Sequence, residues 1–211
     1  GVATLWGDIV SVNGEQALTP GLKFSKYPYP AGEFILLEVE NRAVDLRDTF
    51  KPRMRGDAQQ MLENAAISNP LTPNRDGSLI TRSGELAHLE LAARYSIEQP
   101  VDFVKAVNDA DAARNADRLV HLALQRAAIH VAAELATEQL VDENLRDDTS
   151  QRIRLAAQDV LDQLQCGIRI EALTAMKGSL PLAIEKTSDD LQATKGNSDV
   201  EMTLATQQAS E

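Results

Sequence analysis

Residues 86–97 read LAHLELAARYSI and carry the most regular pattern in the chain. Successive side chains of a strand point to opposite faces, so every second residue shares a face. The apolar face would hold Leu89, Leu91, Ala93, Tyr95 and Ile97. The polar face would hold His88, Glu90, Arg94 and Ser96. This alternation predicts a half-buried antiparallel strand.

Beyond Pro100 the period of the apolar residues changes from two to about 3.6, which is the period of an α-helix. We expect a short helix over 100–106 and a longer one over 109–133. An apolar stripe at helical spacing runs along the longer helix and is formed by Val120, Leu124, Ala127 and Val131.

A further helix is predicted between Thr137, whose hydroxyl is suited to capping its start, and Gly167, which tolerates a left-handed backbone at its end. Its expected apolar face comprises Leu145, Ile153, Ala156, Val160 and Leu164. Residues 168–176, IRIEALTAM, then predict another strand.

The first 74 residues alternate between strand and turn signals. Residues 2–12, VATLWGDIVSV, run into Asn13-Gly14 and predict a β-hairpin. Residues 20–30 contain three prolines and read as extended loop, residues 33–46 as a strand, and residues 47–74 as a loop with room for one short helix. All the elements together predict an α+β fold with a mostly antiparallel sheet packed by helices.

Length and composition exclude several classes of protein. The 211 residues suffice for one domain or two small ones, and 21 basic against 32 acidic residues give a net charge of −11. Such a surface repels nucleic-acid phosphates and anionic lipid headgroups, which disfavours binders of either kind. The longest uninterrupted apolar run, residues 34–37, is far shorter than the roughly 20 residues that span a bilayer.

No motif of catalytic, cofactor-binding or metal-binding chemistry is present, since GxSxG, HExxH, GxGxxG and GxxxxGK[ST] are all missing from the sequence. His121 and His130 are nine residues apart and share a helix face only loosely. Asp147-Asp148 and Asp189-Asp190 fit a solvated helix surface better than an acid/base pair. The single cysteine, Cys166, fits a buried structural thiol better than a nucleophile. We therefore predict no catalytic residue, no cofactor and no metal, and an interaction or structural role.

Residues 181–211 differ from the rest of the chain. Acidic residues outnumber lysines six to two there, and the few apolar residues cannot bury a helix by themselves. We expect this tail either to fray or to borrow stability from a neighbouring helix in an assembly. The candidate oligomer-interface residues are Leu182, Ile184, Leu191, Val200 and Leu204.

The order of these segments resembles the SPFH family, also called band 7 or prohibitin-homology domains. Residues 76–109, DGSLITRSGELAHLELAARYSIEQPVDFVKAVND, look like the family's hairpin, strand, proline and helix signature, and the ending GIRIEAL at 167–173 follows in the family's order. The openings GVATLWGDIV (1–10) and PGLKFSKYPYP (20–30) are similar to those of the HflK branch. Further matching positions are Arg114, Leu119, Arg126, Glu138, Leu140 and Arg146. The resemblance covers about residues 1–192.

The resemblance implies an SPFH domain over 1–178, with a membrane-proximal part at 1–75 and a main part at 76–178, and the start of a coiled-coil helix at 179–211. It also implies a non-enzymatic scaffold of the bacterial inner membrane, with a transmembrane helix just before Gly1 and an extracytoplasmic domain. HflK-like subunits assemble into large cages with a sibling, HflC, and enclose the membrane AAA protease FtsH, whose access to substrates they modulate. The membrane-proximal candidates are Trp6, Phe24, Tyr27 and Tyr29.

Other interpretations of the sequence remain open. The four aromatic residues fit ordinary core and loop packing equally well, and a stomatin- or flotillin-like organiser of membrane domains needs no protease partner. A hydrolase with an unrecognised site is the third alternative. The tail departs from the family pattern, because one proline, Pro181, stands where two are usual, and Ser188 and Gly196 weaken a helix. Since the chain ends at Glu211, we expect it to self-associate weakly.

Overall fold

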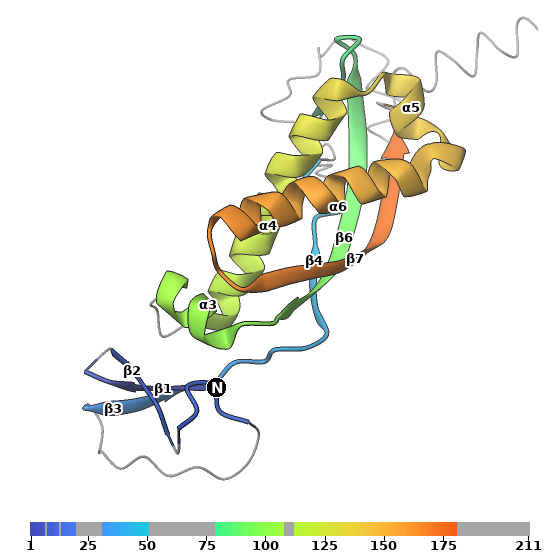
Figure 1. The fold of residues 1–211 in the computed structure, drawn as a ribbon. Helices are drawn as coiled ribbons and strands as arrows, with labels where there is room; N and C mark the ends of the chain where they lie inside the picture. The colour runs from blue at the N-terminus through green and yellow to red at the C-terminus, as the bar shows by residue number, and fades with distance from the viewer. Residues whose placement is uncertain (7, 13, 20–30, 51–78, 108–111, 181–211) are drawn as a thin grey trace, which may run out of the picture.

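The computed structural model describes residues 1–6, 8–12, 14–19, 31–50, 79–107 and 112–180. These residues form an elongated α+β molecule, with a small sheet at one end and a larger sheet packed by helices along the rest (Figure 1). All the strand pairs are antiparallel, as the sequence predicts. The loop predicted over 47–74 lies almost entirely outside the described residues.

The two sheets are built from different parts of the chain. The small sheet has the order β2-β1-β3 and contains β1 (Val2–Leu5), β2 (Asp8–Val10) and β3 (Gly32–Ile35). In the larger sheet, the central strand β6 (Leu86–Ile97) pairs with β4 (Arg42–Asp45) and β5 (Leu79–Ile80), and with β7 (Ile168–Ser179). The strand predicted over 86–97 is therefore confirmed to the residue, and the one over 168–176 is confirmed and three residues longer.

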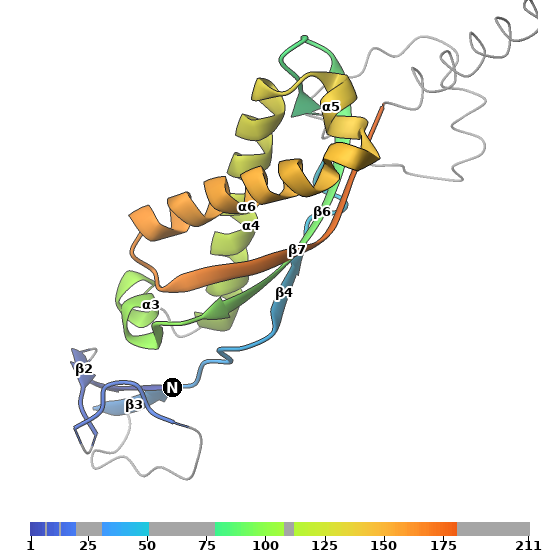
Figure 2. The same ribbon diagram turned by 45° about the vertical axis from the view of Figure 1, so that its right-hand side comes forward.

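The helices follow β6 and return the chain to β7. They are α3 (Pro100–Val107), α4 (Ala112–Glu134), α5 (Thr137–Val141), the 3-10 helix η1 (Glu143–Leu145) and α6 (Arg146–Gln163). Helices α4 and α6 pack against each other and cover one face of the larger sheet (Figure 2). The apolar stripe predicted on the long helix is confirmed as core, since Val120 and Leu124 are fully buried and Ala127 and Val131 nearly so.

The half-buried character predicted for β6 holds for its apolar face but not for all of its polar face. Leu89, Leu91 and Tyr95 are fully buried, as expected. His88, however, is only 4% exposed. The segment at Phe50 lies against this part of β6, and Nδ1 of His88 is 3.1 Å from the Phe50 carbonyl oxygen. A distant loop thus covers a position that alternation alone assigns to solvent.

The single strand predicted over 33–46 is wrong. The chain forms β3 in the small sheet, leaves the strand conformation between residues 36 and 41, and forms β4 in the larger sheet. Asn41 has a left-handed backbone, with φ of 54°, directly before β4. Because a strand cannot pass through this conformation, one apolar run serves two sheets.

The hairpin predicted at the start of the chain forms, but with a different turn. β1 and β2 pair with Leu5 opposite Asp8, so the chain reverses after Leu5, where Trp6 has φ of 51°. A second tight turn contains Gly14, and Val12 and Glu15 close it by exchanging backbone hydrogen bonds of 2.8 and 3.1 Å, whereas Asn13 lies outside the described residues. A turn is therefore present at Gly14, as predicted, but it does not join β1 to β2.

The helix predicted from Thr137 to Gly167 is interrupted, because α5, η1 and α6 divide it. Ala136, not Thr137, occupies the N-cap of α5. Leu145 and Leu164, expected on the apolar face, are 38% and 52% exposed because they flank α6 rather than belong to it. The residues that α6 buries are Thr149, Ile153, Ala157 and Leu161.

The connection from α6 to β7 depends on Gly167. This residue has φ of 62°, and a Cβ at its position would lie 2.6 Å from the carbonyl oxygen of Gln99. Its carbonyl accepts hydrogen bonds from the backbone N–H groups of Glu98 and Gln99, at 2.9 and 3.1 Å. Cys166 beside it is 1% exposed and its thiol donates to the Leu161 carbonyl, so the burial predicted for it is confirmed. Burial raises the pKa of this thiol, which agrees with the structural role predicted for it.

Candidate interaction surfaces

A partly buried polar network joins the central strand to α4. Arg42 of β4 lies opposite Tyr95 of β6 and donates from Nε to the Tyr95 hydroxyl at 2.7 Å. The Tyr95 hydroxyl in turn donates to Asp117 of α4, and Nη2 of Arg42 is 2.9 Å from the second carboxylate oxygen of Asp117. The three side chains therefore form a closed ring of hydrogen bonds between two strands and one helix.

The electrostatics of this network favour a structural role over a role in proton transfer. Burial, together with the hydrogen bond to Asp117, raises the pKa of Tyr95 above its ordinary value. Burial alone would lower the pKa of Arg42, but its hydrogen bonds to Asp117 and Tyr95 outweigh that effect and raise the pKa. Tyr95 therefore stays neutral and Arg42 stays charged around neutral pH. No local sequence pattern indicates this contact, because Arg42 and Asp117 are 75 residues apart.

A second polar cluster fixes the β5–β6 hairpin to the junction of α4 and α5. The Thr81 and Thr137 hydroxyls are 2.8 Å apart, and the Ser83 hydroxyl lies 3.0 and 3.1 Å from them. The backbone N–H of Arg82 donates to the Leu135 carbonyl at 2.9 Å. Thr137 is thus used to hold the hairpin, which explains why it does not cap α5 as predicted.

A polar groove of about 710 Å³ lies between α3, the end of α6 and the start of β7. Its basic side chains form ion pairs with acidic side chains of the same groove. Nε of Arg169 lies 2.5 Å from Oε1 of Glu98, and Nζ of Lys105 lies 3.7 Å from Oδ1 of Asp102. Gln158 spans the remaining gap, since its amide donates to the Ile168 carbonyl at 3.0 Å and accepts from the Ile170 N–H at 2.8 Å. These side chains satisfy one another and the edge of β7, which favours a structural role for the groove.

The outward face of α4 has the opposite character. Leu122 and Ile129 are each 51% exposed and, seven residues apart, lie on one side of the helix. Together with Gln125, Arg126 and His130 they line a shallow apolar depression of about 360 Å³. The seven-residue spacing of Leu122 and Ile129 is visible in the sequence, but only the inward stripe of this helix was predicted from it.

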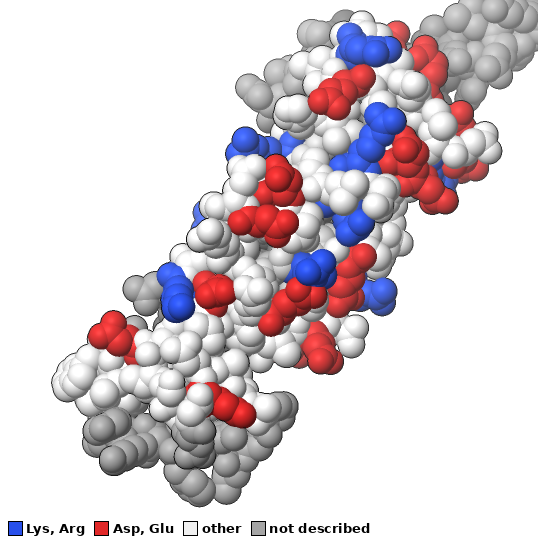
Figure 3. Space-filling model, in the orientation of Figure 1, with Lys and Arg blue, Asp and Glu red and all other residues white. Residues whose placement is uncertain are grey.

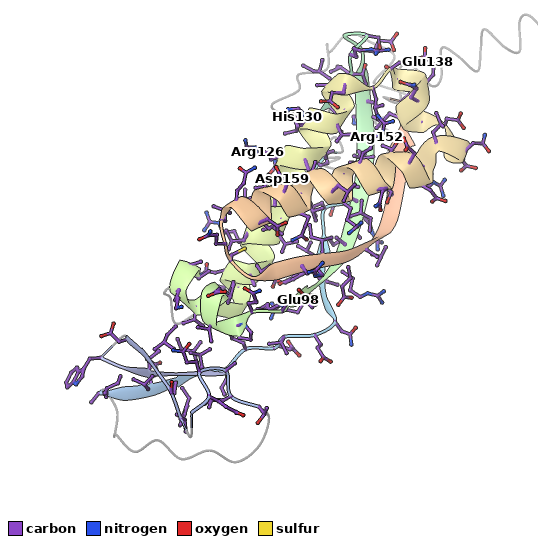
Figure 4. The ribbon with its side chains drawn as sticks, in the orientation of Figure 1. Glu98, Arg126, His130, Glu138, Arg152 and Asp159 are labelled. Carbon is purple, nitrogen blue, oxygen red and sulfur yellow. The ribbon has the colours of Figure 1, made fainter. Side chains whose placement is uncertain are left out.

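The charge of this face also differs from that of the whole chain. Its cations are Arg114, Arg118 and Arg126, and its acid is Glu134, which pairs with His130 at 3.3 Å. Asp117 is turned inward to Arg42. Acidic and basic side chains are instead mixed over α6 and β7 (Figure 3). Arg126 and His130 lie along α4, whereas Arg152 and Asp159 lie along α6 (Figure 4).

Of the residues predicted to lie near a membrane, only Trp6 is among those described. Its side chain is 77% exposed at the end of the small sheet. Phe24, Tyr27 and Tyr29 lie outside the described residues, as do Leu182, Ile184, Leu191, Val200 and Leu204 at the predicted oligomer interface. Both groupings remain predictions.

In the described part of the chain, no three His, Cys, Asp or Glu side chains are grouped so that they could hold a metal ion. None of the helices in the same ranges combines the length and apolar character needed to cross a bilayer. Comparison with known proteins adds no assignment, because neither a known family model nor a curated protein matches the chain.

Proposed function

We propose that this chain is a scaffold subunit of the SPFH type, closest to the HflK branch, that forms large membrane-anchored cages and modulates an enclosed AAA protease. Its partners would be further copies of the chain or a sibling HflC-like subunit, together with an FtsH-like protease and the bilayer. The collinear sequence motifs suggest the family, and the arrangement of the described elements supports the role.

The observation that carries the proposal is the position of the two ends of the described body. Gly1 directly precedes β1 in the small sheet at one end of the elongated molecule, whereas β7 runs to the opposite end and finishes beside α5 (Figures 1 and 2). A subunit that links a bilayer on one side to a cage wall on the other needs the chain to arrive and leave in this way. A compact enzyme has no such requirement.

Trp6 agrees with the orientation that the proposal requires. It lies at the same end as Gly1, and its indole is largely exposed. Tryptophan favours the interface between lipid and water, because its ring is apolar and its N–H is polar. In the proposed arrangement the small sheet therefore faces the bilayer, and the α5 end faces the cage wall.

The test is to extract the natural protein gently from its membranes and to identify by mass spectrometry what elutes with it in the largest fraction. We expect a sibling SPFH subunit and an AAA protease. A large assembly without a protease would favour the membrane-organiser alternative. A monomer without partners would contradict the proposed function.

A further inference from the structure

The outward face of α4 combines exposed apolar side chains with positive charge, although the chain as a whole has a net charge of −11. The inward stripe of α4 packs into the core, whereas Leu122 and Ile129 lie outside the core cluster. Arg118 and Arg126 are exposed beside them and form no ion pair with any residue in the described ranges. This combination fits a partner segment that is acidic and carries a few apolar residues.

The outward face of α6 shows that the combination is not a general property of this helical layer. Leu155 is exposed to a similar extent, 53%, but it is the one large apolar side chain exposed between the ends of that helix. Arg152 beside it is paired with Asp148 at 2.8 Å, and Asp159 adds a further acid. Leu155 therefore provides a matched control for Ile129.

The tail at residues 181–211 has the chemistry that the α4 face lacks. Its six acids and two lysines give 2 − 6 = −4, and Ile184 and Leu191 repeat the seven-residue spacing of Leu122 and Ile129. Asp189 and Asp190 lie between Ile184 and Leu191, much as Arg126 lies between the two apolar residues of α4. The spacing of apolar residues and the sign of charge are thus complementary.

We propose that residues 181–211 of one copy dock on the outward face of α4 of a second copy. Ile184 and Leu191 contact Leu122 and Ile129, while the tail carboxylates lie near Arg118 and Arg126. This inference rests on the assembly proposed above and names one of its contacts. A single contact of this size is weak, and repetition around a closed assembly strengthens it through local concentration.

The contact can be tested by cysteine crosslinking between differently labelled full chains. One carries Ile129→Cys, and the other carries Ile184→Cys or Leu191→Cys. The native Cys166 does not interfere because it is 1% exposed. We expect the heterodimer yield to exceed that of the Leu155→Cys control about tenfold, because docking raises the local concentration of the two thiols. A yield equal to that of the control would overturn the inference.

Charge reversal provides an independent readout that a folding defect would not reproduce. Arg118→Glu with Arg126→Glu should return crosslinking to the level of the control, and Asp189→Lys with Asp190→Lys in the other chain should restore it. Raising the salt concentration should lower the yield for the unreversed pair, since exposed charges are screened. Failure of the reversed tail to rescue crosslinking would argue against charge pairing at this face.

Three outcomes distinguish this inference from a contact within one chain and from the proposed function. If a chain with both cysteines links only to itself at high dilution, the tail docks on its own α4 and the second-copy inference is wrong. If the natural protein forms its large assembly but gives no crosslink at Ile129, the inference fails and the proposed function stands. If crosslinking occurs but extraction yields no large assembly, the proposed function fails.

Discussion

The inward and outward faces of α4 are both apolar, but they are partnered differently. On the inward face, Val120 and Leu124 are fully buried and Asp117 bonds to Arg42 and Tyr95. On the outward face, Leu122 and Ile129 are half exposed. The comparison indicates that the stability of the fold depends on the inward face. We expect the outward face to contribute little to it, and in the proposed assembly this face contacts a second copy of the chain.

Truncating the inward face should have the largest effect. Leu124→Ala removes a fully buried side chain and leaves a cavity between α4 and the sheet, so we expect a loss of about 2–5 kcal/mol in the free energy of unfolding. Urea denaturation followed by circular dichroism measures this loss. A change below about 1 kcal/mol would mean that α4 is not anchored as described.

Breaking the hydrogen-bond network of Arg42, Tyr95 and Asp117 should have the second largest effect on stability. Asp117→Ala leaves the Arg42 guanidinium, whose side chain is 9% exposed, and the Tyr95 hydroxyl without their shared acceptor. We expect a cost of about 1–3 kcal/mol, because Arg42 remains charged and largely buried. The adjacent Arg118→Ala is the matched control and should change stability by less than about 0.5 kcal/mol. Equal effects of the two variants would show that the network does not stabilise the fold.

Tyr95→Phe should have a smaller effect that depends on pH. Loss of the hydroxyl should cost about 0.5–1.5 kcal/mol at neutral pH. Burial raises the pKa of Tyr95 in the folded state, so its contribution is complete below the unfolded pKa of about 10 and declines as pH rises toward the folded pKa. The difference between wild type and Tyr95→Phe should therefore narrow above about pH 10. A constant difference would contradict the assigned network.

The outward face should give the smallest change in stability. Leu122→Ala with Ile129→Ala removes side chains that are half exposed, so we expect each to change the free energy of unfolding by less than about 0.5 kcal/mol. The same variant should nevertheless reduce crosslinking between copies. If it instead unfolds the protein as Leu124→Ala does, the two faces of α4 do not differ in the way the comparison states.

Much of the fold could be predicted wherever the pattern is local. The alternation at residues 86–97 and the stripe from Val120 to Val131 correspond directly to β6 and to the buried side of α4. Local patterns could not show that residues 33–46 serve two sheets, because that depends on the left-handed backbone at Asn41 and on pairing with β6. Nor could they show that Thr137 bonds to Thr81, 56 residues away.

The candidate surfaces were less predictable than the fold. Leu122 and Ile129 are as apolar as the core residues around them, and only the packing of α4 shows which side of the helix remains exposed. The hydrogen-bond network formed by Arg42, Tyr95 and Asp117 joins three elements that are far apart in sequence. Trp6 was singled out as an aromatic residue, and its exposure follows from the turn after β1.

The most direct test of the account is the molar mass of the natural protein in gentle membrane extracts, measured by light scattering for wild type and for Leu122→Asp with Ile129→Asp. We predict a large assembly for wild type and a much smaller species for the variant, with the same circular dichroism spectrum for both purified proteins. A monomeric wild type would contradict the proposed scaffold. An unchanged large assembly in the variant would contradict the role of the α4 face.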